Sequence, residues 1–291
     1  MTDRGTIVLV VGSLHYDIMV EADHLPRRDE TAVGSGWYPK FGGKGGNQAV
    51  SASLNGARSR MVGSVGADGF GAFLRDRLQA SAVDFQQVAT LAGTGSGMSV
   101  AIMDRAGDYA ATIVSGANLL ISPSELLKPQ VWRDVGLLVL QNEVPDAVNI
   151  AAATEAGRRG IATLLNAAPW REIPAALRGL IDILVVNAVE AEMMGAAPIR
   201  DLQGAADAAR TLAVHAPTVI VTAGALGLAA WRKADEPFIL PAEVVEVVSS
   251  HGAGDSFVGA LAAGLMRGED LWSACSAASH AAALHVAGRS A

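Results

Sequence analysis

Short apolar runs separated by stretches of helical periodicity constrain the fold of this chain more than any other feature. The runs are bounded by Gly, Pro or Asn and cover residues 7–11, 137–140, 161–165, 183–186 and 219–221. Between the last four, helical periodicity covers residues 146–159, 173–180 and 202–215. Continuous apolar strands are buried on both faces, and their alternation with helices is typical of parallel sheets. The middle of the chain is therefore predicted to be a doubly wound α/β sheet.

The N-terminal third follows a different pattern, because its apolar segments are short and separated by polar turns. Strands are predicted over residues 16–21, 31–38, 98–103 and 109–114, which together suggest a small antiparallel sheet. Since these strands are inserted between βα units, we expect them to form a lid over the carboxyl end of the main sheet. The lid is expected within about residues 16–40 and 97–115.

The last third of the chain is predicted to complete the main sheet. Strands are expected over residues 229–231, 238–240 and 244–248, followed by helices over residues 254–266 and 271–286. The sequence has no internal repeat and no low-complexity linker. The simplest prediction is one domain, residues 1–291, with its lid.

Composition limits the classes of partner. With 51% hydrophobic and 18% charged residues among 291, the chain can bury a large core. A net charge of −7 without a Lys or Arg stripe argues against nucleic acid, and the apolar runs are shorter than the roughly 20 residues of a membrane helix. Residues 1–4 lack a signal-peptide pattern, and the single cysteine, Cys275, cannot form an intrachain disulfide. We therefore expect a cytoplasmic protein.

A glycine-dense segment, residues 42–48 with the sequence GGKGGNQ, lies just before an apolar helical stretch. Glycine backbone lets a ligand approach closely, and the amides at a helix start favour polar or anionic groups. The segment is not a Walker phosphate loop, because Gly45 follows Lys44 where Ser or Thr would be required. A tight strand-to-helix turn that binds no ligand is the competing interpretation.

A second glycine-containing turn, residues 250–255 with the sequence SHGAGD, lies between a predicted strand and a predicted helix. Its glycines can direct several backbone N–H groups to one place, forming an anion hole for the charge that grows on a transferring phosphoryl group. Asp255, beside this hole, is well placed to accept a proton from a hydroxyl group. On spacing alone, a helix cap is the competing interpretation for Asp255.

Further polar residues follow the predicted strands. Asp17 follows the first strand and Glu143 a later one, positions from which carboxylates can accept hydrogen bonds from sugar hydroxyls. Asn187 and Glu190 follow a third strand and have the spacing of a capping box. Their functional interpretation is that they orient phosphate and the water shell of Mg²⁺. Each residue taken alone also fits a turn or a cap.

Taken together and in this order, segments over essentially the whole chain resemble the ribokinase family of carbohydrate kinases, also called the PfkB family. The matching segments are Gly12 and Ser13 with Asp17, residues 42–49, residues 63–68 with Gly71, residues 141–143, residues 166–169, Asn187 with Glu190, residues 222–224 and residues 252–257. The resemblance implies a Rossmann-like, doubly wound, mostly parallel sheet with a small β lid that often serves as a dimer interface. It also implies transfer of the γ-phosphoryl group of ATP to a primary hydroxyl, with Mg²⁺.

The resemblance further implies a role for each matching residue. Asp255 would be the catalytic base, and the anion hole would be formed by Gly252, Ala253 and Gly254. The residues implied to bind the sugar, besides Asp255, are His15, Asp17, Gly43, Lys44, Asn47 and Glu143. The residues implied to line the nucleotide site are Asn187, Thr222, Gly224 and Gly254. Glu190 would lie near Mg²⁺ and act through water.

The chain departs from the family pattern at two places. His15 stands where ribokinases usually have Asn, which keeps a hydrogen-bonding group but changes its shape and adds titration near neutrality. Ser249, Ser250 and His251 stand where the family commonly has Asp and Thr or Ile around a monovalent-cation loop, which removes a carboxylate ligand suited to K⁺. We therefore expect activation by K⁺ near Ser249 and His251 to be weak or absent.

The expected function is an ATP-dependent sugar kinase that phosphorylates a pentose, converting ribose to ribose 5-phosphate. A kinase of another sugar or of a nucleoside is the first alternative, suggested by His15. A non-catalytic sugar- or nucleotide-binding sensor is the second. The presence of Asp255 argues against a sensor, because a sensor needs no base.

Overall fold

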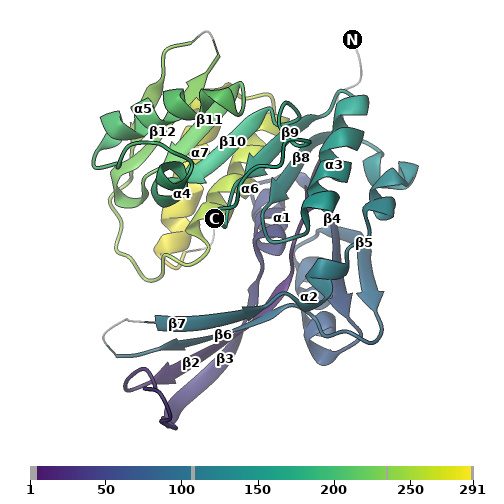
Figure 1. Ribbon diagram of the computed structural model, residues 1–291, viewed down its shortest axis with the longest axis vertical. Helices are drawn as coiled ribbons and strands as arrows, with labels where there is room; N and C mark the ends of the chain where they lie inside the picture. Colours follow the sequence, from purple (N-terminus) through teal and green to yellow (C-terminus); the bar gives the residue numbers. More distant parts are fainter. Residues whose placement is uncertain (1–4, 106–108, 234, 290–291) are drawn as a thin grey trace.

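The computed structural model of the protein describes residues 5–105, 109–233 and 235–289. Its body is a nine-stranded sheet flanked by helices, and a second, four-stranded sheet projects from it (Figure 1). The strands of the main sheet lie in the order β13-β12-β11-β10-β9-β8-β1-β4-β5. Their bounds are β1 Ile7–Val11, β4 Arg58–Gly66, β5 Asp84–Leu91, β8 Val135–Gln141, β9 Ala162–Asn166, β10 Ile183–Asn187, β11 Thr218–Thr222, β12 Gly227–Arg232 and β13 Phe238–Pro241.

All the strands from β11 to β5 in this order are parallel, and β12 and β13 form an antiparallel extension at one edge. The connecting helices are α1 Lys44–Leu54, α2 Gly69–Ala80, α3 Asp146–Arg158, α4 Ala188–Met193, α5 Leu202–Thr211, α6 Ala253–Met266 and α7 Leu271–Val286. Short 3₁₀ turns lie at Gly116–Leu120, Pro123–Leu127, Pro129–Trp132, Leu212–Val214 and Gly224–Leu226.

Two hydrophobic cores cover the two faces of the main sheet. The side chains of β1 alternate between them: Ile7, Leu9 and Val11 belong to one core, and Val8 and Val10 to the other. The first core is closed by α3, α4 and α5, and the second by α1, α2, α6 and α7. Burial on both faces explains the continuous apolar runs of these strands and confirms the doubly wound fold.

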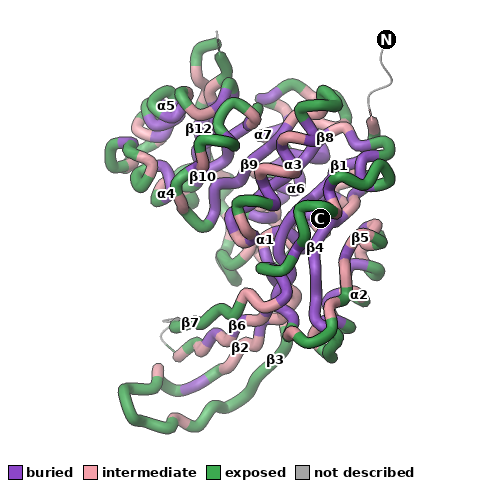
Figure 2. Tube along the Cα trace, turned by 45° about the vertical axis from the view of Figure 1, so that its right-hand side comes forward, coloured by how far each residue is buried: buried purple, intermediate pink, exposed green. Residues whose placement is uncertain are grey.

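The projecting sheet consists of β2 His15–Ala22, β3 Gly34–Gly42, β6 Met98–Met103 and β7 Tyr109–Val114, in the order β3-β2-β6-β7. Figure 2 shows mostly exposed residues along β3, in contrast to the buried central strands of the body. The expectation of a purely antiparallel sheet is wrong, because β2 and β6 are parallel. These two strands each enter the lid from the body, so they run in the same direction. Residues 106–108 of the expected lid range, and residues 1–4, lie outside the described residues.

Three predicted elements differ in the structure. Residues 173–180 form turns rather than a helix, since Pro174 opens the segment and Gly179 has a left-handed φ of 79° within little more than one helical turn. Residues 244–248 are not a strand: they follow the edge strand β13, and Val244 is fully exposed. The strand expected over residues 31–38 is displaced to β3, which pairs with β2 over its whole length. No helix within the described residues is long and apolar enough to span a membrane.

Candidate active site

The strand order brings the polar residues that follow the strands to one edge of the main sheet. Neighbouring parallel strands end at the same edge, where open α/β sheets place their ligands. Along this edge, in the order β11, β10, β9, β8 and β1, the residues that end or follow the strands are Thr222, Asn187, Asn166, Gln141 with Glu143, and Gly12 with Ser13. The residues expected to bind nucleotide therefore lie near β10 and β11, and those expected to bind sugar lie near β8 and β1.

Asp255 lies in the first turn of α6, where Gly252 adopts a left-handed φ of 88° at the N-cap position. The carboxylate is only 6% exposed and accepts hydrogen bonds from Asn47 Nδ2 at 3.1 Å and Gln48 Nε2 at 2.9 Å. Both donors come from α1, which packs against α6. No described backbone amide of α6 donates to this side chain, so the interpretation of Asp255 as a helix cap is wrong.

A chain of hydrogen-bonded, buried amide side chains supports the Asp255 carboxylate. It consists of Gln48, Asn166 and Gln141, to which the sequence analysis assigned no role. Gln48 Nε2 also donates to Asn166 Oδ1 at 3.1 Å, and Gln48 Oε1 accepts from Gln141 Nε2 at 2.8 Å. Gln48 and Gln141 are fully buried. The sequence did contain one indication of a role for Gln48. This residue lies in the apolar stretch of a predicted helix, one position after Asn47, and a buried amide requires hydrogen-bond partners.

Burial raises the pKa of Asp255, while the neighbouring Lys44 and the two amide donors act in the opposite direction. Burial disfavours the charged carboxylate, and a nearby cation favours it. The group is thus a stronger base than an exposed aspartate, as a general base requires.

The pH dependence of activity tests this arrangement. Asp255 accepts a proton only when ionised, so we expect kcat/KM to fall on the acid side at a pH above the ordinary aspartate pKa of 3.8. Lys44→Met removes the cation that lowers the pKa of Asp255, so the acid limb should move to higher pH. A pH profile of kcat/KM measures this, with Lys128→Met at an exposed pair as the control. An acid limb left unmoved by Lys44→Met would contradict the assignment.

The start of α6 presents backbone amides beside Asp255. The Ala253 amide donates to the Ser250 carbonyl oxygen at 3.2 Å, which holds the turn closed. Among the described residues, the amides of Gly254 and Asp255 have no such acceptor. Free amides at a helix N-terminus attract anionic oxygens, so these two are the donors available for a transferring phosphoryl group.

The acceptor side contains two carboxylates. Glu143 Oε2 accepts from Ser13 Oγ at 2.5 Å and from the Lys44 backbone amide at 2.8 Å, which ties the ends of β1 and β8 to the start of α1. Asp17 Oδ1 accepts from Ser99 Oγ at 2.5 Å across the β2–β6 pair. The Asp17 carboxylate also lies over Gly42, where a Cβ atom would approach Oδ2 to 2.0 Å. A side chain at position 42 would displace this carboxylate from its observed position.

His15 lies two residues before Asp17 on β2, so both side chains point to the same face of the lid sheet. The imidazole is 4% exposed, and its buried Nε2 has no hydrogen-bond partner. A buried polar atom without a partner is costly unless a ligand satisfies it. Gly43, next to the start of α1, adopts a left-handed φ of 84° and packs against the backbone of residues 13–15.

The nucleotide side begins at β10. Asn187 Oδ1 accepts from the Glu190 amide at 2.8 Å, and Glu190 Oε2 accepts from the Asn187 amide at 2.9 Å, so the expected capping box is confirmed. Thr222 ends β11, and its hydroxyl contacts the Val186 carbonyl oxygen at 3.4 Å. Gly224 has a left-handed φ of 56° and faces open space.

The surroundings of Glu190 are compatible with the expected contact to Mg²⁺ through water. Its carboxylate is 7% exposed, its pKa is raised by burial, and Oε1 stays outside the capping box. A single carboxylate that acts through water is a usual protein contribution to Mg²⁺ beside phosphate oxygens. Within the described part of the chain, no three His, Cys, Asp or Glu side chains group as a metal site. In the loop before α6, Ser249 Oγ accepts from the His251 amide at 3.3 Å.

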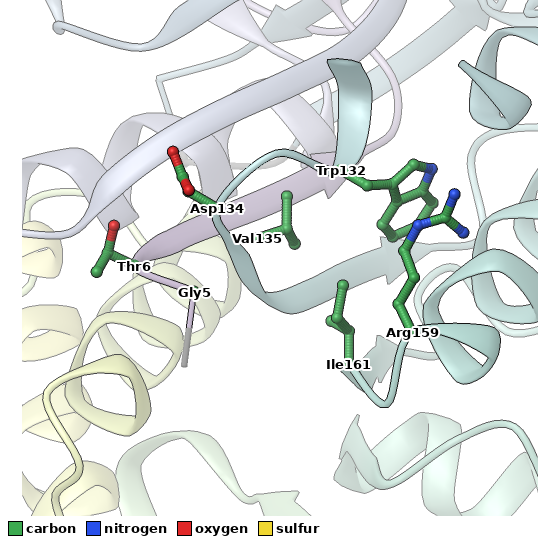
Figure 3. A pocket seen from close by; sticks show the side chains of 7 residues that line it. All are labelled: Gly5, Thr6, Trp132, Asp134, Val135, Arg159 and Ile161. Carbon is green, nitrogen blue, oxygen red and sulfur yellow. The ribbon is translucent and has the colours of Figure 1, made fainter. Parts of the chain in front are cut away.

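Two cavities differ in their relation to these residues. A cavity of about 440 Å³ is lined by residues at the amino ends of β1, β8 and β9, including Thr6, Val135 and Ile161, with Arg159 packed 5.0 Å from the Trp132 ring (Figure 3). It lies at the sheet edge opposite Asp255. A second cavity of about 270 Å³ lies against the turn before α6, between β3, α1 and α7. The larger cavity therefore has no part in the candidate site.

The fold and the site together define a phosphotransferase with an alcohol group as acceptor. A buried carboxylate lies beside helix amides that have no backbone acceptor, between the ends of β1 and β8 on one side and the ends of β10 and β11 on the other. The sequence profile of the pfkB family carbohydrate kinases matches residues 6–291. The chain belongs to this family.

Individual relatives agree with this assignment. The chain is 33% identical to the ribokinase of Mus musculus over 264 residues, which cover 89% of this chain and 82% of that protein. It is 30% identical to the deoxyribokinase of Salmonella typhimurium over 286 residues, which cover 97% of this chain and 93% of that protein. The solved structure of Arabidopsis thaliana ribokinase complexed with ribose and ATP matches with a TM-score of 0.88 and 28% identity, covering 97% of this chain and 93% of that one.

Proposed function

We propose that this protein transfers the γ-phosphoryl group of ATP to the primary hydroxyl of a pentose, converting ribose to ribose 5-phosphate. The observation that carries the proposal is the buried Asp255 carboxylate, held by Asn47 and Gln48 between the two sides of the site. The similarity to the mouse ribokinase and to the Arabidopsis ribokinase complexed with ribose and ATP supports the choice of substrates. A supply of ATP favours the cytoplasm as its location.

In this proposal the sugar lies between the lid and α1. Asp17 and Glu143 accept hydrogen bonds from its hydroxyls, and His15 supplies the unpartnered Nε2. The remaining groups proposed to contact it are Gly43, Lys44 and Asn47. Asp255 takes the proton of the attacking hydroxyl.

Phosphoryl transfer asks little covalent work of the protein, because its transition state is loose and carries charge on the transferring group. In the expected anion hole of Gly252, Ala253 and Gly254, the Ala253 amide is already bonded to the Ser250 carbonyl oxygen, so the amides of Gly254 and Asp255 would stabilise this charge. The residues proposed to hold the nucleotide are Asn187, Thr222, Gly224 and Gly254, and Glu190 would hold the water shell of Mg²⁺. The metal neutralises phosphate charge when bound. Closure of the lid would exclude water, a competing acceptor.

A substrate panel tests the proposed function. ADP release is measured with ribose, 2-deoxyribose, other pentoses, hexoses and nucleosides, each with and without K⁺. We expect ribose to have the highest kcat/KM and K⁺ to change it little, since Ser249 and His251 supply no carboxylate ligand. The absence of turnover with every pentose would overturn the proposal.

A kinase of another sugar or of a nucleoside is the second candidate, and two observations favour it. The deoxyribokinase of Salmonella typhimurium is 30% identical to this chain. His15 places an imidazole where the family usually has Asn, which changes the shape of the acceptor side. Deoxyribose or a nucleoside with a kcat/KM far above that of ribose would establish this candidate. Ligand binding without any turnover would instead indicate a sensor.

We also propose a homodimer formed through the lid sheet. The lid exposes large apolar side chains on both of its edge strands, β3 and β7, and on β6, and monomeric proteins rarely expose large apolar areas. The side chains are Trp37 (65% exposed), Tyr38 (43%), Met103 (37%), Ile113 (58%) and Val114 (53%). We expect a dimer mass in solution, and we expect Trp37→Lys to shift it toward the monomer, as analytical ultracentrifugation would measure. Trp170→Lys, at an exposed tryptophan of the body, is the control. A wild-type monomer would contradict the proposal.

A further inference from the structure

His251 has a firmly held backbone immediately before the anion-hole turn. Its amide donates to Ser249 Oγ at 3.3 Å, and its carbonyl oxygen accepts from His285 Nε2 at 2.9 Å. His285 comes from α7, and its ring also lies against Gly252, where a Cβ atom would be 3.1 Å from Nε2. These contacts hold the backbone from which the His251 side chain extends.

The His251 side chain crosses from this turn toward the lid. Its Nε2 lies 3.9 Å from Asp17 Oδ2, and the imidazole is 58% exposed while the Asp17 side chain is 8% exposed. The separation is too long for a direct hydrogen bond. It suits one shared oxygen atom, because an oxygen about 2.8 Å from each group forms a triangle with a 3.9 Å base at a near-right angle.

The chemistry of the two groups complements a hydroxyl. Partial burial and the charge of Lys40 lower the pKa of His251, although Asp17 and Asp255 act against this, and Lys44 acts with Lys40. The imidazole is thus neutral at neutral pH, and its Nε2–H is able to donate. A hydroxyl between the two groups would donate to Asp17 Oδ2 and accept from His251 Nε2, which satisfies both. An ether oxygen could accept from His251 Nε2 but has no proton to donate to Asp17. A methylene group could form neither hydrogen bond.

We propose that His251 is an acceptor-binding residue that, together with Asp17, selects sugars carrying a hydroxyl at the position between them. The inference rests on the proposed function and names a determinant of its substrate choice. It assigns the side chain of His251 to the sugar rather than to a monovalent-cation loop. His285 is then a positioning residue, because its Nε2 donates to the His251 carbonyl oxygen.

The test compares ribose with 2-deoxyribose and 3-deoxyribose in wild type, His251→Ala and His251→Gln. We expect wild type to discriminate against at least one deoxy sugar. In His251→Ala, kcat/KM for ribose should fall about ten-fold while that for the discriminated deoxy sugar changes little, so the ratio falls about ten-fold. His251→Gln keeps an N–H donor. It should therefore retain most of the ratio of kcat/KM for ribose to kcat/KM for the deoxy sugar. His280→Ala, whose imidazole pairs with the exposed Glu243, is the matched control.

The outcomes separate this inference from the proposed function. An active wild type that does not discriminate, or equal losses for ribose and both deoxy sugars in His251→Ala, would overturn the inference and leave the pentose kinase intact. Equal losses would show that His251 only shapes the anion-hole turn. A wild type without turnover on any pentose would overturn the proposed function and the inference with it. Full retention of the ratio in His251→Ala would also overturn the inference.

Discussion

Asp255→Asn is expected to lower kcat by about 10³- to 10⁴-fold and to leave sugar binding nearly unchanged. General base catalysis contributes about 10²- to 10⁴-fold, and the upper part of this range applies because the carboxylate is buried and its pKa is raised. The amide has the same shape and keeps an oxygen to accept from Asn47 or Gln48. ADP release measures kcat, and calorimetric titration with ribose in the absence of ATP measures binding.

Asp201→Asn is the matched control for this substitution. Asp201 also stands at the start of a helix, where its side chain accepts from the Gly204 amide as the N-cap of α5. Asn is as good an N-cap residue as Asp, so both kcat and thermal stability should be retained. Turnover of Asp255→Asn at the wild-type rate would refute the role of Asp255 as base. A parallel loss of ribose binding would contradict a role confined to the chemical step.

Gly45→Ala is expected to have the largest effect on stability together with a loss of activity. A Cβ atom at Gly45 would lie 2.6 Å from Gly12 C and Ser13 N, which are backbone atoms and cannot rotate away. Overpacking of this kind costs about 1–3 kcal/mol, which for a protein of this size lowers Tm by roughly 2–3 °C per kcal/mol. The start of α1 must shift, and the Asn47 and Gln48 donors shift with it. Since misplacement by about 1 Å costs on the order of 10²-fold, kcat should fall by about that factor.

Gly69→Ala provides the comparison, because Gly69 also lies in the first turn of a helix, α2, and a Cβ atom there meets nothing within 4 Å. Alanine is favoured over glycine in helices by about 0.5–1 kcal/mol, so this variant should be as stable as wild type or slightly more stable. Thermal unfolding and kcat are measured for both variants. A Gly45→Ala protein with wild-type Tm and kcat would show that α1 is not tightly docked on the end of β1.

Elements with a strong local pattern are those that the sequence predicts well. The helix α7 and the strands β6 and β7 have the predicted bounds. In α7 and β6 the buried residues recur with the period of the element, whereas residues 110–114 of β7 are exposed and this strand follows β6 through its pairing. Residues 244–248 have an equally apolar composition but form no strand, since no neighbouring strand is available beyond β13. A segment forms a strand only where a neighbouring strand can pair with it, and the residues of the segment itself do not determine whether such a neighbour exists.

The polar residues of the site divide in the same way. The capping box of Asn187 and Glu190 is formed by residues three positions apart, so its spacing was enough to predict it. The hydrogen bonds from Gln48 to Asp255 and to Asn166 join residues more than a hundred positions apart. No periodicity along the chain indicates such contacts.

By itself, the sequence determined the doubly wound class, the position of most helices and strands, and the set of polar residues that follow the strands. It did so because burial on a sheet or helix face imposes a period on neighbouring residues. Only the tertiary structure decided which groups surround Asp255. The strand order β10-β9-β8-β1 and the packing of α1 on α6 bring Asn47 and Gln48 to its carboxylate and His251 to within 3.9 Å of Asp17. These approaches depend on how the layers pack, which is a property of the whole chain.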